Sequence, residues 1–232
     1  QITKIDKENK FFKNLEKIPT DKLTEKEKIY IFNGLSKGYF DQNKNDLGFE
    51  NLEKANRIKK KISDFSIDVQ RTLFKNIKKY FETNYLKKIE YKNKLKKNPI
   101  FIVGMPRSGT TLLHQLVASA SDVDGVGESY VVPQFFESMI FSKEFLNNIY
   151  KNNKFNKDYL IEISNSLGSK YDKIKQDNKN IIVDKNPSNF YWIGFLKLLF
   201  PNSKVIHIKR NLKDVSLSLY KNIFGVAEMD WS

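Results

Sequence analysis

The chain has 232 residues, enough to bury a sizeable core in one large domain or two small ones. Its 40% hydrophobic and 13% aromatic residues exclude a chain that is disordered overall. No apolar run approaches the roughly 20 residues that span a bilayer, so no membrane span is predicted. The sequence has no cysteine, which excludes disulfides, and its two histidines are too few for most zinc sites. No metal is expected.

The formal net charge is +14, yet only four of the 41 basic residues are arginines. A lysine-rich composition explains much of this excess, and attraction for acidic ligands is the alternative. A nucleic-acid partner is not predicted. Because arginine can hold a phosphate through a planar, bidentate contact, we expect Arg107 and Arg210 to mark an anion site rather than an ordinary charged surface.

The segment from Thr20 to about Ile62 is predicted to form two amphipathic helices, separated by the polar residues 43–46. The spacing of five residues resembles one tetratricopeptide repeat: Leu35, Tyr39, Gly48, Leu52 and Ala55. An ordinary helical hairpin is the alternative. A genuine repeat buries its faces against further copies, so it would imply others before residue 1 and a surface for a protein partner.

Further helices are predicted from Ile67 to Lys96, where a lysine-rich linker ends. We therefore expect a helical N-terminal segment over residues 1–96 and a separate core over 97–232. In the core, strand-like and helix-like segments alternate: strands at 100–103, 181–183 and 204–208, and helices at 110–121, 134–148, 189–200 and 211–224. This alternation predicts an α/β fold with a parallel sheet flanked by helices on both faces. Ligands of such sheets bind beyond the carboxyl ends of the strands.

The most informative segment is residues 99–113, in which an apolar run leads through a glycine-bounded turn directly into a helical pattern. Backbone N–H groups converge in such a P-loop turn, and the helix presents its positive end, so phosphate or sulfate is the expected ligand. Gly104 and Gly109 have the spacing of the nucleotide triphosphatase loop, but Thr110 stands where that motif requires lysine. An ordinary kinase or ATPase is therefore disfavoured.

The residues Pro106-Arg-Ser-Gly-Thr-Thr-Leu112 resemble the 5'-phosphosulfate loop of the sulfotransferases that use 3'-phosphoadenosine-5'-phosphosulfate (PAPS). A second region, Ile181 to Ser218, resembles the 3'-phosphate segment of that family. Together the matches cover roughly residues 99 to 224. Bacterial sulfotransferases with tetratricopeptide repeats before the core are similar in arrangement. The family's core is longer, so we expect this one to be truncated at its C-terminus.

The resemblance implies two anchors for the cosubstrate. One holds its 5' end, through Arg107, Ser108, Gly109, Thr110 and Thr111. The other holds its 3'-phosphate, through Arg210 and Ser218, with Ser216 as a competitor for the serine role. All of these groups are hydrogen-bond donors suited to an anion.

Sulfuryl transfer by in-line displacement needs a base for the acceptor proton and a cation for the leaving oxygen. Glu128, in Gly127-Glu-Ser-Tyr-Val-Val-Pro133, matches the base of the tyrosylprotein sulfotransferases. Lys185, in Asp184-Lys-Asn-Pro187, matches their catalytic lysine, and Arg107 would share the charge. The histidine base of the cytosolic enzymes, in Lys-Thr-His-Leu-Pro, has no counterpart here. His114, three residues after Thr111, could approach the site, but a surface or packed histidine is expected there, and His207 is expected to be structural.

The predicted function is sulfuryl transfer from PAPS to a hydroxyl acceptor, with protein tyrosine, sugars and small phenols all open. One alternative is a P-loop nucleotide kinase, in which Asp184 would hold magnesium. Another is a non-catalytic module that binds partners through its helical segment. A cytoplasmic location is expected, although the first residue is Gln rather than Met, so a leader could have been lost.

Overall fold

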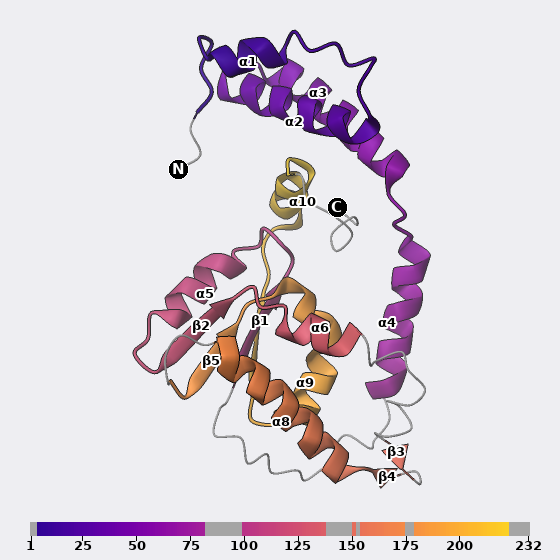
Figure 1. Cartoon of the computed structure of the whole chain (residues 1–232), viewed down its shortest axis with the longest axis vertical. Coiled ribbons are helices and arrows are strands. Elements are labelled where there is room, and N and C mark those ends of the chain that lie inside the picture. Colours follow the sequence, from indigo (N-terminus) through magenta and orange to yellow (C-terminus); the bar gives the residue numbers. More distant parts are fainter. Residues whose placement is uncertain (1–3, 82–98, 138–149, 152–153, 175–178, 223–232) are drawn as a thin grey trace. The chain divides into compact units, whose positions relative to one another are not determined.

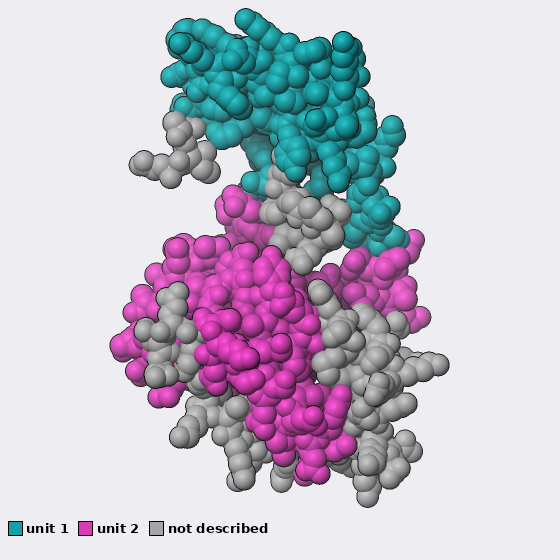
Figure 2. All heavy atoms as spheres, in the orientation of Figure 1, with its two compact units in different colours: residues 1–67, 216–232 teal, residues 68–215 magenta. Residues whose placement is uncertain are grey.

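The computed structural model of the chain describes residues 4–81, 99–137, 150–151, 154–174 and 179–222. The chain divides into two compact units, one formed by residues 1–67 and 216–232 and the other by residues 68–215 (Figure 2). The boundary predicted at residue 96 lies in 82–98, outside the described residues, so it stays a prediction.

The first unit contains the two predicted helices, α2 (Glu25–Asp41) and α3 (Asn45–Ile62), preceded by a short helix that was not predicted, α1 (Lys10–Leu15). Thr24 and Glu27 form a capping box that fixes the start of α2. Asn43 adopts a positive φ of 61°, which ends α2 and reverses the chain. The predicted helical pair and its polar break are therefore confirmed.

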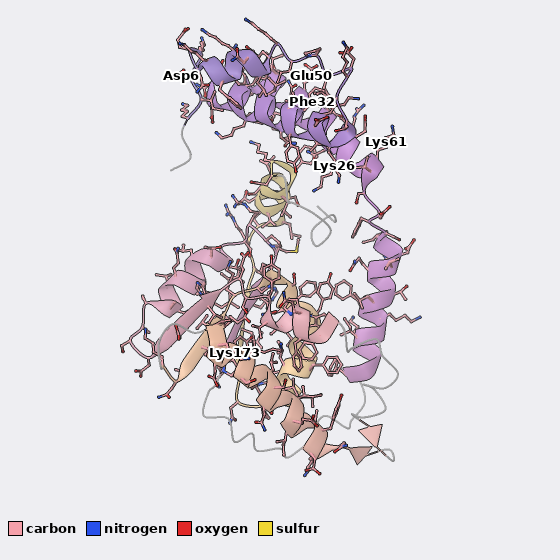
Figure 3. All side chains as sticks on the ribbon, viewed as in Figure 1. Asp6, Lys26, Phe32, Glu50, Lys61 and Lys173 are labelled. Carbon is pink, nitrogen blue, oxygen red and sulfur yellow. The ribbon has the colours of Figure 1, made fainter. Side chains whose placement is uncertain are left out.

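Small residues allow these helices to pack closely. A Cβ on Gly38 of α2 would lie 2.0 Å from the ring of Phe12, and one on Gly48 of α3 would lie 2.8 Å from the ring of Phe40. Figure 3 labels Phe32 on α2 and Glu50 on α3. This close packing defines a helical hairpin, and its assignment as a tetratricopeptide repeat stays a prediction.

The second unit is built on a four-stranded parallel sheet in the order β2-β5-β1-β6 (Figure 1). Its strands are β1 (Ile100–Gly104), β2 (Val123–Gly127), β5 (Ile181–Asp184) and β6 (Lys204–Ile208). The predicted α/β fold is confirmed. Strand β2 was not predicted because two of its five residues are glycines and one is an aspartate, which disfavour strands.

Helices cover both faces of this sheet, as predicted. Phe101 and Ile182 pack in the larger core with α6 (Val131–Glu137), α8 (Lys157–Ile174) and α9 (Ile193–Leu199). Their neighbours Ile102 and Val183 pack on the opposite face with α5 (Thr110–Ala118). This alternation of side chains along a strand is what buries each strand on two faces.

The remaining elements differ from the sequence predictions in several details. The helix predicted over 189–200 begins as a 3-10 helix, η2 (Pro187–Trp192), before continuing as α9. Part of the helix predicted over 134–148 is α6, and residues 138–149 lie outside the described part. Helix α8 was not predicted; Lys173 lies in its last turn (Figure 3). The other elements are α4 (Ile67–Phe81), α10 (Leu212–Tyr220) and the short pair β3 (Tyr150–Lys151) and β4 (Lys154–Phe155).

None of the described helices combines the length and the apolar character needed to cross a bilayer.

Candidate active site

The anion loop, residues 104–111 from the end of β1 to the first turn of α5, has a backbone conformation that its glycines make possible. A Cβ on Gly104 would lie 2.8 Å from the carbonyl oxygen of Ile208 in β6, so the strands can approach only with glycine there. Gly109, the N-cap of α5, has a φ of 105°. Arg107 also has a positive φ, 69°, which is uncommon for a residue other than glycine. The loop is therefore held in a specialised conformation.

Ser108 is a largely buried residue of this loop. The residue is 8% exposed, and within the described part of the chain its Oγ has no hydrogen-bond partner. Buried hydroxyls are normally paired, so such an atom beside a helix N-terminus suits an anion. Thr110, at the first position of the nine-residue α5, is buried as well. These residues fit the phosphate group that the sequence predicts.

Lys185 and Glu128 form an ion pair at the same edge of the sheet. The Nζ of Lys185 donates to Oε1 of Glu128 and, at 3.3 Å, to Oγ1 of Thr111. The Lys185 side chain is 5% exposed, whereas that of Glu128 is 53% exposed. Three residues predicted for the site from distant parts of the sequence are thus in direct contact, with the carboxylate open to solvent.

Strand pairing explains why these residues meet. Strands β2 and β5 run parallel, with Gly127 opposite Asp184, so Glu128 and Lys185 each follow the carboxyl end of their strand. The backbone N–H of Lys185 donates to the Gly127 carbonyl at 2.9 Å. The side chain of Asn186 donates to the Ser129 carbonyl at 2.8 Å, which ties the two turns together a second time.

Arg210 lies near Arg107, the other arginine of the predicted site. One of its terminal nitrogens donates to the Arg107 carbonyl at 3.5 Å, and its Nε lies 3.7 Å from the Asp214 carboxylate. Gly104 and Ile208 are partners at the carboxyl ends of β1 and β6, so both arginines follow the same edge of the sheet. The two predicted anchor loops therefore face one region. Ser218 lies on α10, and its pairing with Arg210 stays a prediction.

Asp184 is a buried carboxyl group directly before Lys185. Tyr171 of α8 donates to its Oδ2, and the side chain of Asn189 donates to its Oδ1 at 3.0 Å. Burial raises the pKa of Asp184 to about 7, against the opposing effects of these two hydrogen bonds and of Lys185. Burial and the neighbouring carboxyl raise the pKa of Tyr171 well above its usual value. The structure thus places Asp184 in an internal network with its oxygens bonded to protein.

The raised pKa of Asp184 predicts how stability depends on pH. Between about pH 4 and pH 7 the folded chain keeps this proton while the unfolded chain, with an ordinary pKa of 3.8, has lost it. The stabilising contribution of Asp184 to the free energy of unfolding is therefore full below pH 3.8 and is lost as the pH rises to about 7. Asp184→Asn removes the titration, so across this window wild type should lose up to about 1.4 kcal/mol of unfolding free energy per pH unit relative to the variant.

Urea unfolding at pH 5 and pH 7.5 measures this difference. Asp158→Asn, the same substitution at an exposed aspartate of α8, is the matched control. Parallel pH curves for wild type and Asp184→Asn would contradict the raised pKa.

Sequence reasoning missed the groups that support the site. Tyr171 and Asn189 were not singled out, and His114 was expected to be a surface or packed histidine; its ring accepts a hydrogen bond from the Gly127 amide. Their only sequence signal was their presence on or beside apolar, core-facing segments. Among the described residues, no group of three or more histidines and carboxylates is placed to hold a metal ion.

The parallel sheet thus carries a glycine-bounded loop and a lysine–glutamate ion pair at its carboxyl edge. The model of the sulfotransferase family matches residues 99–232, and the chain belongs to that family. A protein of Aquifex aeolicus (strain VF5), named only as uncharacterized, is 34% identical over 187 residues, which is 78% of this chain and 24% of that protein.

A second relative is a putative protein-tyrosine sulfotransferase of Caenorhabditis briggsae. It is 26% identical over 129 residues, which is 55% of this chain and 45% of that protein. The chain thus spans about a quarter of one relative's length and less than half of the other's.

Proposed function

We propose that the chain transfers a sulfuryl group from PAPS to a hydroxyl acceptor by in-line displacement. The observation that supports this most is the contact of Lys185 with both Glu128 and Thr111 of the anion loop. A cation, a carboxylate and an anion-binding helix end are the groups that this chemistry requires, and here they meet at one edge of the sheet. Membership of the sulfotransferase family supports sulfuryl transfer in general.

The anion loop would hold the 5' end of PAPS through five residues: Arg107, Ser108, Gly109, Thr110 and Thr111. The Oγ of Ser108, which has no hydrogen-bond partner among the described residues, and the N-terminus of α5 support this assignment. Arg210 would hold the 3'-phosphate, with Ser218 assigned by resemblance alone. When bound, PAPS supplies a sulfuryl group on a phosphate leaving group. No metal is assigned to the site.

Lys185 and Glu128 would have separate roles in the reaction. The ammonium of Lys185, already buried beside the loop, stabilises negative charge on the leaving oxygen, with Arg107 as a second cation. The more exposed carboxylate of Glu128 accepts the proton of the attacking hydroxyl. Because Glu128 also accepts the Lys185 hydrogen bond, the proton acceptor and the cation are held in one fixed arrangement.

Membership of the family supports a hydroxyl group as the acceptor and does not distinguish among hydroxyl compounds. The name of the C. briggsae relative favours protein tyrosine, and sugars and small phenols stay as alternatives. A protein partner that binds the helices of the first unit is part of the same proposal. The cytoplasmic location stays a prediction.

Calorimetry with 3',5'-ADP, the nucleotide product, tests the two anchors without knowledge of the acceptor. Arg210→Ala should weaken binding by about 10- to 150-fold, the loss of a charged hydrogen bond worth about 1.5–3 kcal/mol. Arg71→Ala is the matched control, because Arg71, like Arg210, is exposed and pairs with an aspartate a few residues away in the sequence. Equal affinity in wild type and Arg210→Ala, or no binding by a folded wild type, would contradict the proposed site.

Turnover is measured as release of 3',5'-ADP from PAPS with 4-nitrophenol, a tyrosine-containing peptide or glucose as acceptor. The same sulfuryl-transfer assay reports the turnover of every site variant.

A further inference from the structure

His114 connects the helix of the anion loop to the turn that carries Glu128. It lies on α5, three residues after Thr111, and its Nε2 accepts a hydrogen bond from the backbone N–H of Gly127 at 3.1 Å. A Cβ on Gly125 would lie 3.0 Å from the same nitrogen, so the glycine allows the ring to lie directly against β2. This contact joins two elements that both contribute to the site.

The hydrogen bond defines the protonation state of the ring. An Nε2 that accepts an N–H must carry no hydrogen, so the neutral ring holds its proton on Nδ1. Burial and the nearby charge of Lys185 lower the pKa of His114, opposed by a hydrogen bond with the backbone of Val183. Lys185, which follows β5, is the charge acting on the ring, and Glu128, which follows β2, is paired with it. The ring is therefore neutral at neutral pH.

The backbone N–H and the carbonyl of Gly127 both form hydrogen bonds. His114 accepts from the N–H, and the carbonyl accepts from the backbone of Lys185 at 2.9 Å. Gly127 has a φ of 66°, a conformation that glycine adopts freely and leaves as freely. The conformation of the residue before Glu128 is thus set by hydrogen bonds rather than by steric restriction, and His114 supplies the one to its N–H.

We propose that His114 is a positioning residue, whose Nε2 fixes the Gly127–Glu128 turn relative to Lys185 and Thr111. The inference rests on the proposed sulfuryl transfer, since that reaction gives the position of Glu128 its importance. His114 acts through the backbone and needs no contact with substrate. Losing the bond frees the glycine turn and moves the carboxylate away from the attacking hydroxyl.

Two substitutions separate the hydrogen bond from the bulk of the ring. His114→Leu removes the acceptor, and His114→Gln keeps an acceptor oxygen. We expect His114→Leu to lower kcat by about 10- to 100-fold, the cost of a misplaced catalytic group. The KM for PAPS and the Kd for 3',5'-ADP should stay within about twofold of wild type, because a role through Glu128 alone leaves ground-state binding intact. His114→Gln should restore most of kcat.

His207→Gln, at the exposed histidine of β6, is the matched control and should have wild-type kinetics. A wild-type kcat in His114→Leu would overturn the inference, and so would a kcat in His114→Gln as low as in His114→Leu while both variants stay folded.

Nuclear magnetic resonance of the wild-type chain tests the contact without any variant. Long-range ¹⁵N–¹H spectra of the imidazole should show a hydrogen on Nδ1 and a bare Nε2 at pH 7. A hydrogen on Nε2 would overturn the inference even in an active enzyme. The expected tautomer in a chain that binds no 3',5'-ADP and transfers no sulfuryl group would contradict the proposed function instead, and the positioning role with it.

Discussion

Lys185→Met is expected to lower turnover in the sulfuryl-transfer assay by about 10²–10³-fold, the usual cost of removing a preorganised charge-stabilising group. Lys185 is 5% exposed, so its ammonium acts where water screens it little. Its contacts with Thr111 and Glu128 hold it in place before any ligand arrives. Methionine has a similar unbranched stem without the charge. Affinity for 3',5'-ADP should fall much less than turnover.

Lys170→Met, at an exposed lysine of α8, is the matched control and should keep wild-type turnover. Thermal unfolding of both variants reports whether the fold survives, which we expect because Glu128, the partner left unpaired, is half exposed and stays solvated. Turnover within twofold of wild type would remove Lys185 from the mechanism. A loss of turnover matched by an equal loss of 3',5'-ADP affinity would assign the lysine to binding alone.

The sheet could be predicted where its strands are apolar runs. Strand β6 has the bounds expected from its alternating sequence, and β1 and β5 differ from expectation by one residue each. Strand β2 has no such run, and it becomes a strand because β5 supplies its hydrogen-bond partner. Helix α8 contains several serines and a glycine that weaken its local signal, and its helical character comes from a buried stripe: Leu160, Ile163, Leu167 and Tyr171.

The residues of the site, too, could be predicted from the sequence only in part. The anion loop and the pair Glu128 and Lys185 were predicted because their neighbours in the chain form motifs. Tyr171 and His114 were not assigned to the site, because their partners are a carboxyl and a backbone amide 13 residues away. Such contacts exist only once α8 and α5 have packed on the sheet, so no local pattern reveals them. Sequence therefore indicates the groups that carry the chemistry, and packing determines what holds them.

Glu128→Gln is expected to lower turnover by about 10²–10⁴-fold, the range found for loss of a general base. Glutamine keeps the shape of the side chain and an oxygen that can accept the Lys185 hydrogen bond, so the arrangement of the site should persist. What the amide cannot do is accept a proton from the attacking hydroxyl. Affinity for 3',5'-ADP should therefore be unchanged, which separates proton transfer from cosubstrate binding.

Glu162→Gln, at an exposed glutamate of α8, carries the same chemical change away from the sheet edge and should leave turnover unchanged. The comparison with Lys185→Met distinguishes two roles for the ion pair. If Glu128 served only to position Lys185, Glu128→Gln would keep most of the activity, because the amide oxygen still accepts from the ammonium. A large loss with nucleotide affinity intact is expected only of a carboxylate that takes the proton itself, and full turnover would assign that step to another group.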